Sequence, residues 1–319
     1  MPTRRAILAT MGALALFSRN SNAAPAAAAG LALWPGTPPE GGGPSGDVEE
    51  NAKGAISNIA VPKIDIYQPA SPNGMAVLIA AGGGYKRIEM RNEALPAARW
   101  LNARGITAFV LSYRLPDEGW AAGPLAPLQD AQRALRLIQA NAGKFKIDPE
   151  QLGVLGFSAG GHLLGMAAAR SAFASYPAID DADALPARPA FAALVYPVIT
   201  LKPPYDHTST RKVLIGSHPS PALSSEWSVE DHVKARCPPV FLAQAEDDPV
   251  SDPQNTLIMQ AACDHAHVPV ELHRLADADM GSVWASPAPP RCNGPAFSQA
   301  GSTSSHCLPA ENRYVSKAA

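Results

Sequence analysis

The feature that most constrains the fold is a strand, a tight turn and a helix between residues 152 and 169. An apolar run from Leu152 leads into Gly-Phe-Ser-Ala-Gly at 156–160, and small residues follow to Ala169. A serine between two glycines at such a junction is typical of a sharp turn that exposes the serine hydroxyl. A glycine-rich turn with an incidental serine is the alternative, and the flanking strand and helix argue against it. We therefore predict Ser158 as a nucleophile, with the Ala159 N–H placed to stabilise an oxyanion.

Strand-like and helix-like segments alternate along much of the chain. We expect strands at 59–67, 75–81, 106–111, 152–156, 190–199, 239–243 and 268–273, and helices at 93–104, 128–142, 159–169 and 253–265. Such alternation favours right-handed crossovers and a mostly parallel sheet with helices on both faces. We therefore predict one α/β domain over residues 31–276, with an irregular Gly- and Pro-rich lead-in to residue 51. The polar stretch at 202–236 interrupts the alternation and is interpreted as an inserted loop or small cap.

Charge and cysteine usage exclude several classes of function. Only 17% of the residues are charged, the formal net charge is -2, and the sequence contains no basic run. Nucleic acid and anionic membranes both need clustered positive charge, so neither is an expected partner. The four cysteines form no Cys-x-x-Cys pair, and we predict no metal and no organic cofactor. Cys237 and Cys263 would form either a disulfide after export or two free buried thiols.

The first 24 residues resemble an export signal. Arg4 and Arg5 precede an apolar run that ends at Phe17, and small residues follow near Ala23. The apolar run is shorter than the 20 or so residues that span a bilayer, so we expect no stable membrane anchor. The paired arginines resemble a twin-arginine signal, and an ordinary secretory signal is the alternative. Either one predicts a periplasmic or secreted protein.

Two further segments complete a site around the serine. Residues 81–85 read Ala-Gly-Gly-Gly-Tyr after an expected strand, and backbone amides of Gly83 and Gly84 would donate to the same oxyanion as Ala159. An ordinary tight turn is the alternative for this loop. The strand at 239–243 runs into Glu246-Asp247-Asp248-Pro249. Asp248 is our candidate for orienting a histidine, Asp247 is its rival, Glu246 is less favoured, and a helix-capping acid is the structural alternative.

Taken together, these motifs resemble a known family. Six motifs follow one another in the same order as in that family: LWPG at 33–36, AAGGGY at 80–85, LSYRL at 111–115, LQDAQRAL at 128–135, GFSAGGH at 156–162 and AEDDPV at 245–250. The chain resembles an α/β-hydrolase of the acetyl esterase/lipase type, in the bacterial group of xylan and feruloyl esterases. The resemblance implies an α/β-hydrolase fold and a serine hydrolase. It also gives Tyr113, Arg114 and Asp130 counterparts in the family, which we interpret as structural.

The chain departs from this family after the strand at 268–273. The resemblance implies a loop that carries the catalytic histidine and then a closing helix, but the tail from 277 to 319 has no helical period. Consider a frame in which each codon takes the last base of one present codon and the first two bases of the next. In this frame the codons that begin at the last base of Met280 and of Trp284 must both encode glycine. The same frame permits a loop and a helix like those of the family. We therefore interpret 277–319 as an out-of-frame tail caused by a frameshift near residues 275–278. The DNA sequence of the gene tests this interpretation.

If the tail is native, the catalytic base must come from another histidine. His273 ends the last expected strand, and His306 lies in the irregular tail. We expect His265 and His267 to face solvent, and His162 to be packed or hydrogen-bonded one helical turn after Ser158. We assign none of them as the base.

The sequence predicts a serine esterase that cleaves short acyl esters through an acyl-enzyme. The resemblance implies acetyl-type esters, with plant polysaccharide such as xylan as a carbohydrate substrate. Two alternatives stay open. One is an inactive or unstable product without the catalytic histidine, and the other is a related serine peptidase, which would usually carry an additional propeller or large cap.

Overall fold

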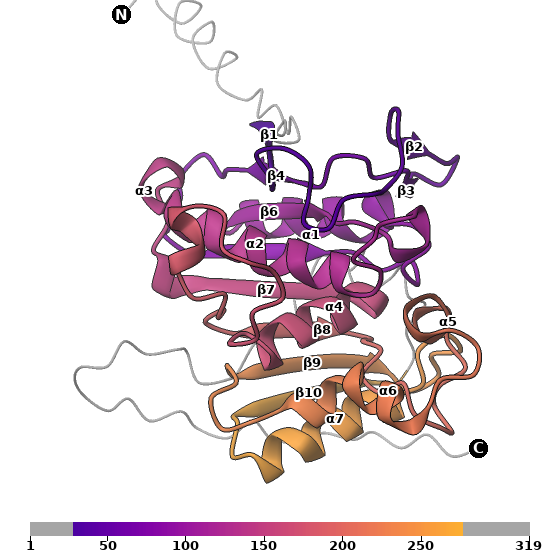
Figure 1. Cartoon of the computed structure of the whole chain (residues 1–319). Coiled ribbons are helices and arrows are strands. Elements are labelled where there is room, and N and C mark those ends of the chain that lie inside the picture. The colour runs from indigo at the N-terminus through magenta and orange to yellow at the C-terminus, as the bar shows by residue number, and fades with distance from the viewer. Residues whose placement is uncertain (1–27, 277–319) are drawn as a thin grey trace, which may run out of the picture. The chain divides into compact units, whose positions relative to one another are not determined.

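Strands from most of the described chain join in one eight-stranded sheet (Figure 1). The structure, a computed structural model, describes residues 28–276. The predicted export signal at 1–24 and the predicted out-of-frame tail at 277–319, with His306, therefore lie outside the described residues. The strands follow the order β1-β4-β6-β5-β7-β8-β9-β10 across the sheet. Their bounds are β1 Ala28–Ala32, β4 Lys63–Tyr67, β5 Ala76–Ala80, β6 Thr107–Ser112, β7 Leu152–Phe157, β8 Ala192–Val195, β9 Val240–Ala245 and β10 Val270–Leu275.

The predicted, mostly parallel sheet is confirmed. Neighbouring strands from β6 through β5, β7, β8 and β9 to β10 all pair in parallel, whereas β4 pairs antiparallel with both β1 and β6. Every residue of β5, β6 and β7 is buried, which explains why these strands are continuous apolar runs in the sequence. The lead-in, expected to be irregular as far as residue 51, begins inside β1 and contains β2 (Glu49–Glu50), which pairs with β3 (Ile56–Ser57) just after it.

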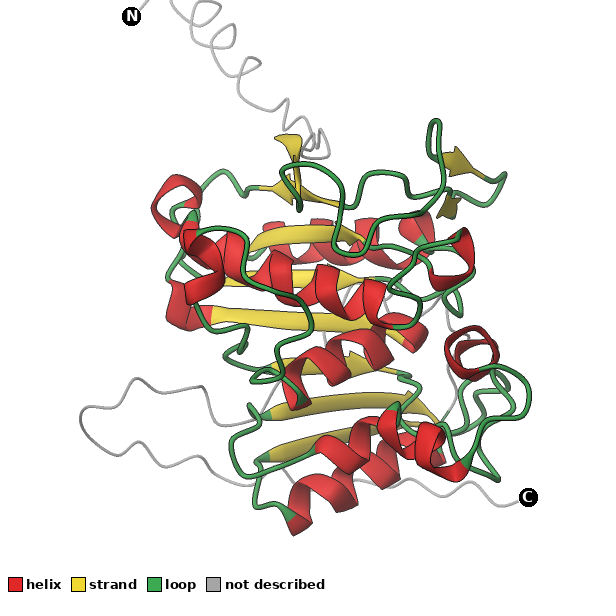
Figure 2. Ribbon diagram, viewed as in Figure 1, coloured by secondary structure: helices red, strands yellow, loops and turns green. Residues whose placement is uncertain are grey.

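Helices cover both faces of this sheet, as predicted (Figure 2). On one face α2 packs against α4, and α7 packs against β9 and β10. On the opposite face α1 packs against β4 and β6. The helices are α1 Leu95–Asn102, α2 Leu125–Ala140, α3 Ala142–Phe145, α4 Ser158–Ala169, α5 Ser209–Ile215, α6 Pro221–Glu226 and α7 Gln254–His265.

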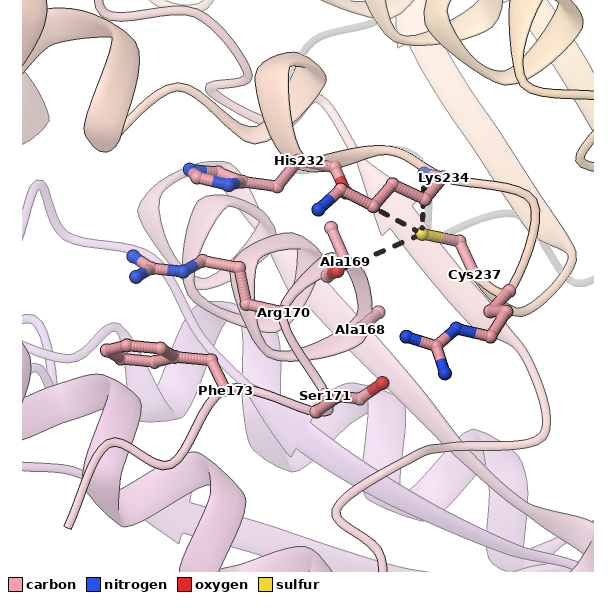
Figure 3. A pocket seen from close by; sticks show the side chains of 10 residues that line it. Ala168, Ala169, Arg170, Ser171, Phe173, His232, Lys234 and Cys237 are labelled. Atoms are coloured by element: carbon pink, nitrogen blue, oxygen red, sulfur yellow. Dashed lines mark hydrogen bonds between the residues drawn. The ribbon is translucent and has the colours of Figure 1, made fainter.

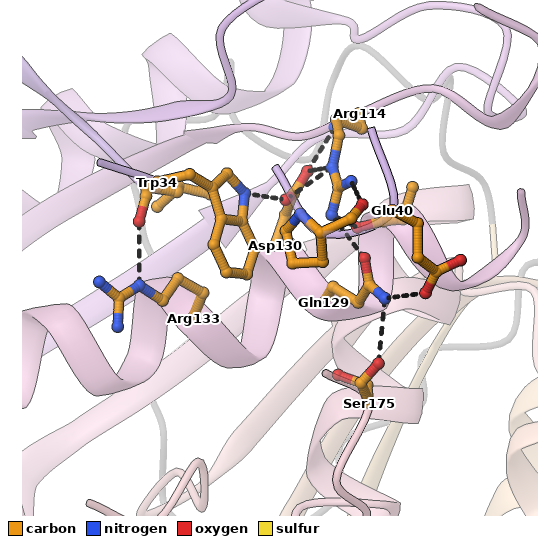
Figure 4. A network of polar contacts seen from close by, with 10 residues as sticks. Trp34, Glu40, Arg114, Gln129, Asp130, Arg133 and Ser175 are labelled. Carbon is orange, nitrogen blue, oxygen red and sulfur yellow. Dashed lines mark hydrogen bonds and ion pairs between the residues drawn. The ribbon is translucent and has the colours of Figure 1, made fainter. Parts of the chain in front are cut away.

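A buried polar network fixes the loop after β6 to helix α2 (Figure 4). Asp130 on α2 accepts hydrogen bonds from the backbone N–H of Arg114 at 2.8 Å, from its Nε at 2.9 Å and from Trp34 Nε1 at 2.8 Å. Both charged side chains have no solvent exposure. Burial raises the pKa of Asp130 to about 6, while the Arg114 charge opposes this rise. The network holds the Leu33–Gly36 segment and the Arg114 turn in place, in accord with the structural role expected of Arg114 and Asp130.

The inserted segment at 202–236 contains two short α-helices, α5 and α6, and the 3-10 helix η5 (Val229–His232). The Thr208 side chain caps α5 by accepting the Arg211 N–H, and the Ser220 side chain caps α6 by accepting the Leu223 N–H. A Cβ built on Gly84 would lie 2.6 Å from the Cβ of Ser209, the first residue of α5. The insertion therefore contacts the loop that follows β5.

Candidate functional site

Ser158 lies at the junction between β7 and α4, where the backbone takes an unusual conformation. Phe157, the last residue of β7, is extended, whereas Ser158 has φ 48° and begins α4. A left-handed conformation costs a non-glycine residue roughly 1–2 kcal/mol, so neighbouring contacts must hold it. The Ser158 carbonyl accepts the Val198 N–H at 3.2 Å. The side chain remains partly exposed, so its hydroxyl is open to a substrate.

The glycines around Ser158 are required by close packing between strand and helix. A Cβ on Gly160 would lie 2.1 Å from the Ala80 carbonyl oxygen, and one on Gly156 would lie 2.4 Å from the Gly160 carbonyl oxygen. Both distances are far inside normal contact, and both neighbours are backbone atoms. Helix α4 can therefore approach β5 and β7 only with glycine at these two positions.

The glycine loop after β5 lies directly against Ser158. A Cβ built on Gly82 would be 2.8 Å from Ser158 Cβ and 3.0 Å from the Phe157 carbonyl oxygen. Gly83 and Gly84 have φ values of 122° and 65°, which suit glycine. Within residues 28–276, the N–H groups of Gly83 and Gly84 bond to no acceptor. The N–H of Ala159 lies in the first turn of α4, where no carbonyl of the helix is available to it. These are the three donors predicted from the sequence.

Asp248 is the buried acid of the three candidates after β9. Its side chain is 6% exposed, whereas Glu246 and Asp247 are exposed. The Asp248 carboxylate accepts the N–H groups of Val250 at 2.8 Å and Ser251 at 3.0 Å, and the Gln244 amide at 3.0 Å. Three donors fix the carboxylate in one orientation. Glu246 instead approaches Arg274 at 3.4 Å.

No histidine of the described region bonds to Asp248 or to Ser158. His162 is buried, with Nδ1 2.9 Å from the Tyr85 hydroxyl and Nε2 2.7 Å from the Trp227 carbonyl oxygen. Burial lowers the pKa of His162 to about 4, so the ring is neutral at pH 7. It is hydrogen-bonded and packed, as expected.

The remaining histidine candidates are also engaged elsewhere or exposed. His273 Nε2 lies 2.5 Å from Glu271 Oε1, and its ring packs beside Phe241. His265 and His267 are exposed, as predicted. The structure thus assigns the catalytic base to none of these three.

Glu93 and Tyr196 also belong to the site, and sequence reasoning did not single them out. Glu93 lies in the short π-helix η1 (Met90–Ala94), and its Oε2 accepts the Gly82 N–H at 2.5 Å. Tyr196 follows β8, and its hydroxyl donates to Glu93 Oε1 at 3.2 Å. Burial raises the pKa of Glu93 to about 7, partly offset by these two hydrogen bonds. Glu93 sits in a predicted helix and Tyr196 in a predicted strand, so their sequence context indicated only structure.

A separate pocket of about 350 Å³ lies at the other end of α4 from Ser158 (Figure 3). Arg170, His232 and Lys234 contribute positive or titratable groups to its wall. Cations beside the last turn of a helix stabilise its exposed carbonyl groups. Cys237, also in this wall, and Cys263 are both free buried thiols. Burial raises the pKa of Cys263 to about 12, which keeps that thiol protonated.

Residues 28–276 contain neither a cluster of metal ligands nor a membrane-spanning helix. Groups of three or more His, Cys, Asp or Glu side chains that could hold a metal ion were not found in that region. The same region contains no helix that is both long and apolar enough to cross a membrane.

Comparison with known proteins gives relatives for most of the described chain. Over 185 residues it is 30% identical to an acetylxylan esterase from Xylanibacter ruminicola, a match that covers 57% of this chain and 35% of that protein. Over 193 residues it is 34% identical to endo-1,4-beta-xylanase B from Butyrivibrio fibrisolvens, covering 60% of this chain and 30% of that protein. The chain therefore spans about a third of the length of these two relatives.

A solved structure and a family model extend the comparison. The acetyl ester-xyloside bifunctional hydrolase from Caldicellulosiruptor lactoaceticus superposes with a TM-score of 0.64 and 32% identity, covering 78% of this chain and 86% of that one. These matches confirm the predicted resemblance to α/β-hydrolase esterases. The family model described as BD-FAE matches residues 64–262, which is more than half of the chain. The chain therefore belongs to the BD-FAE family.

Proposed function

We propose that this protein is a carboxylic ester hydrolase in which Ser158 forms an acyl-enzyme. The observation that carries the proposal is the meeting of a partly exposed, left-handed serine with three backbone N–H groups, those of Gly83, Gly84 and Ala159, that have no acceptor among residues 28–276. A nucleophile and a cluster of amide donors are the two parts that acyl transfer needs. Each donor typically lowers the barrier by about 2.7–4 kcal/mol.

The reaction divides into two acyl transfers. In the first, Ser158 Oγ attacks the ester carbonyl carbon and gives up its proton, and the carbonyl electrons move onto the oxygen beside the amide donors. When the carbonyl re-forms, the carbon–oxygen bond to the alcohol breaks and the alcohol takes the proton. Water then attacks the acyl carbon, the bond to Ser158 Oγ breaks, and Oγ regains a proton from the water as the acid is released. Asp248 would orient the histidine that moves these protons.

The second candidate function is that of an inactive gene product, a chain that lacks this histidine and does not hydrolyse esters. It is favoured by one observation, that no histidine in the described part of the chain hydrogen-bonds to Asp248 or Ser158. The histidine would then belong to the segment after β10, where we propose that a frameshift has replaced the native sequence. Restoring the other reading frame in the gene would supply both the histidine and the closing helix.

Hydrolysis of p-nitrophenyl acetate by the purified full chain separates the two candidates, with Ser158→Ala as the control. Turnover that disappears in Ser158→Ala supports the esterase. A wild-type rate equal to that of the control contradicts it and supports the inactive product. In that case the frame-restored chain is the next protein to assay.

We further propose that the substrate is an acetylated polysaccharide of the xylan type. The support is that one matched relative is named an acetylxylan esterase, another a xylanase and a third an acetyl ester-xyloside hydrolase. The insertion at 202–236 would act as a small cap, because α5 contacts the glycine loop. Acetate release from acetylated xylan, compared with p-nitrophenyl acetate, tests this choice of substrate.

We propose an exported, periplasmic or secreted location, carried by the twin-arginine-like segment at residues 1–24. Such a location gives access to polysaccharide outside the cell. Replacing Arg4 and Arg5 together by Lys and following the chain in cell fractions tests the route. Retention of the double variant inside the cell supports it, whereas unchanged export contradicts it.

A further inference from the structure

Glu93 reaches the glycine loop from a different element of the fold. It lies in η1, and its Oε2 accepts the N–H of Gly82 at 2.5 Å. The position of a Cβ on Gly82 would be 3.3 Å from this oxygen and 2.8 Å from Ser158 Cβ. The Glu93 carboxyl group and the proposed nucleophile are therefore neighbours on two sides of the same glycine.

The second oxygen of Glu93 ties the loop to the next part of the sheet. Oε1 accepts the Tyr196 hydroxyl at 3.2 Å, and the Tyr196 N–H donates to the Ala243 carbonyl oxygen of β9 at 2.7 Å. Tyr196 directly follows β8, so the chain of contacts crosses from the loop after β5 to the strands that precede Asp248. The Glu93 carboxyl group thus connects the glycine loop, which would hold the oxyanion, with the part of the sheet that leads to Asp248.

The amides of the glycine loop differ in whether they are bonded. The loop can turn different N–H groups toward Ser158 because glycine allows several backbone conformations. With the Gly82 N–H bonded to Glu93, the loop leaves the N–H groups of Gly83 and Gly84 without acceptors among residues 28–276. A backbone bond from Glu89 N–H to the Gly82 carbonyl oxygen at 3.1 Å fixes the other side of the same residue.

We propose that Glu93 is a positioning residue of this site: by accepting the Gly82 N–H it holds the glycine loop so that the Gly83 and Gly84 amides face the substrate. This inference rests on the proposed esterase function. Its own content is the shape of the loop, which can be measured whether or not the protein turns over. Glu93 itself transfers no proton and forms no bond to substrate.

The test compares Glu93→Ala with Glu93→Gln. Alanine removes the acceptor, whereas the glutamine carbonyl can still accept the Gly82 N–H. Glu89→Ala is the matched control, because Glu89 is a carboxylate in the same turn whose Oε1 accepts from Arg87 Nε at 2.6 Å and whose side chain bonds to none of the loop amides. All three variants are made in the full chain.

Hydrogen exchange of peptides covering residues 81–87 is the first measurement, because it is independent of activity. We expect Glu93→Ala to exchange about tenfold faster or more in this segment, since an amide bonded to a carboxylate is among the better-held ones. Glu93→Gln and Glu89→Ala are expected to stay near wild type. Wild-type exchange in Glu93→Ala overturns the proposal, even if the protein proves to be inactive.

Ester hydrolysis is the second measurement. We expect Glu93→Ala to lower kcat by about 10- to 100-fold with KM changed much less, because misplaced donors weaken the transition state more than substrate binding. Glu93→Gln should keep most of the wild-type kcat. A loss in kcat that glutamine does not restore overturns the positioning role. If Glu93→Ala fails to fold, Tyr196→Phe is used instead, because it removes only the hydrogen bond from the Tyr196 hydroxyl to Glu93. Faster exchange of residues 81–87 in Tyr196→Phe is then the expected result, and unchanged exchange contradicts the proposal.

Discussion

Gly82→Ala tests whether the glycine loop and the nucleophile are packed as closely as the structure has them. The new Cβ would lie 2.8 Å from Ser158 Cβ and 3.0 Å from the Phe157 carbonyl oxygen. Carbon atoms make optimal contacts at about 3.5–4.0 Å, so the loop and Ser158 must separate by roughly 1 Å. Neither neighbour is the end of a flexible side chain. The displacement therefore falls on the reacting groups themselves.

A shift of this size has a predictable cost. Misplacing reacting groups by 1 Å can lower a rate by about 100-fold, so we expect kcat/KM for p-nitrophenyl acetate to fall by about that factor. Overpacking costs about 1–3 kcal/mol, which is a Tm lower by roughly 2–12 °C in a domain of this size. Both are measured on the same preparation, activity by absorbance and Tm by circular dichroism.

Gly36→Ala is the control, because a Cβ there would meet no atom within 4 Å. We expect it to keep wild-type activity and Tm. The reasoning is refuted if Gly82→Ala retains a third or more of the wild-type kcat/KM with an unchanged Tm. That result would mean that the loop does not rest on Ser158 in solution.

Three other predictions follow from buried acids. Asp130→Asn leaves the unexposed Arg114 guanidinium without its counterion, and urea unfolding should show a loss of about 3–5 kcal/mol; a loss below 1 kcal/mol contradicts the network. The pKa of Glu93 rises from 4.5 to about 7 on folding. Between these two pH values Glu93 is therefore protonated in the native state and ionised in the unfolded chain. The wild-type stability relative to Glu93→Gln should therefore fall by about 3 kcal/mol as the pH rises from about 4.5 to 7; a flat difference contradicts this. Asp248→Asn should lower kcat by about 10⁴-fold, whereas the exposed Asp247→Asn should not; equal effects contradict our choice of acid.

Local patterns predicted the strands of the sheet from β4 onward, but not β1, which lies where an irregular lead-in was expected. The expected helix at 128–142 corresponds to α2 at Leu125–Ala140, and the apolar run before Ser158 corresponds to β7. Both carry their signal in consecutive residues, as an apolar face or a continuous buried strand. The helices α5 and α6 were not predicted, because helices of seven and six residues show little periodicity and depend on caps and packing.

Residues of the candidate site were likewise predicted only where their signal lies in consecutive residues. Ser158 and its glycines were predicted because strand, turn and helix occupy consecutive positions. The bond from Tyr196 to Glu93 joins residues 103 positions apart, and the bond from Glu93 to Gly82 joins residues 11 apart. A contact made by tertiary packing leaves no periodic trace in a single sequence. The position of Glu93 could be found only after the order of β5, β7 and β8 in the sheet was known.

Backbone conformation offers a signal of the site that does not depend on its motifs. Tyr85, Ser158 and Tyr196 have φ values of 60°, 48° and 38°, and they follow the ends of β5, β7 and β8. These strands are adjacent in the sheet, so three left-handed non-glycine residues gather at one stretch of its edge. Such residues are costly and persist only where their surroundings hold them. Tyr85 is held by its bond to His162, Tyr196 by its bond to Glu93, and Ser158 by the bond to its carbonyl group. Strained backbone is therefore concentrated at the carboxyl ends of these three strands, where the proposed nucleophile Ser158 also lies.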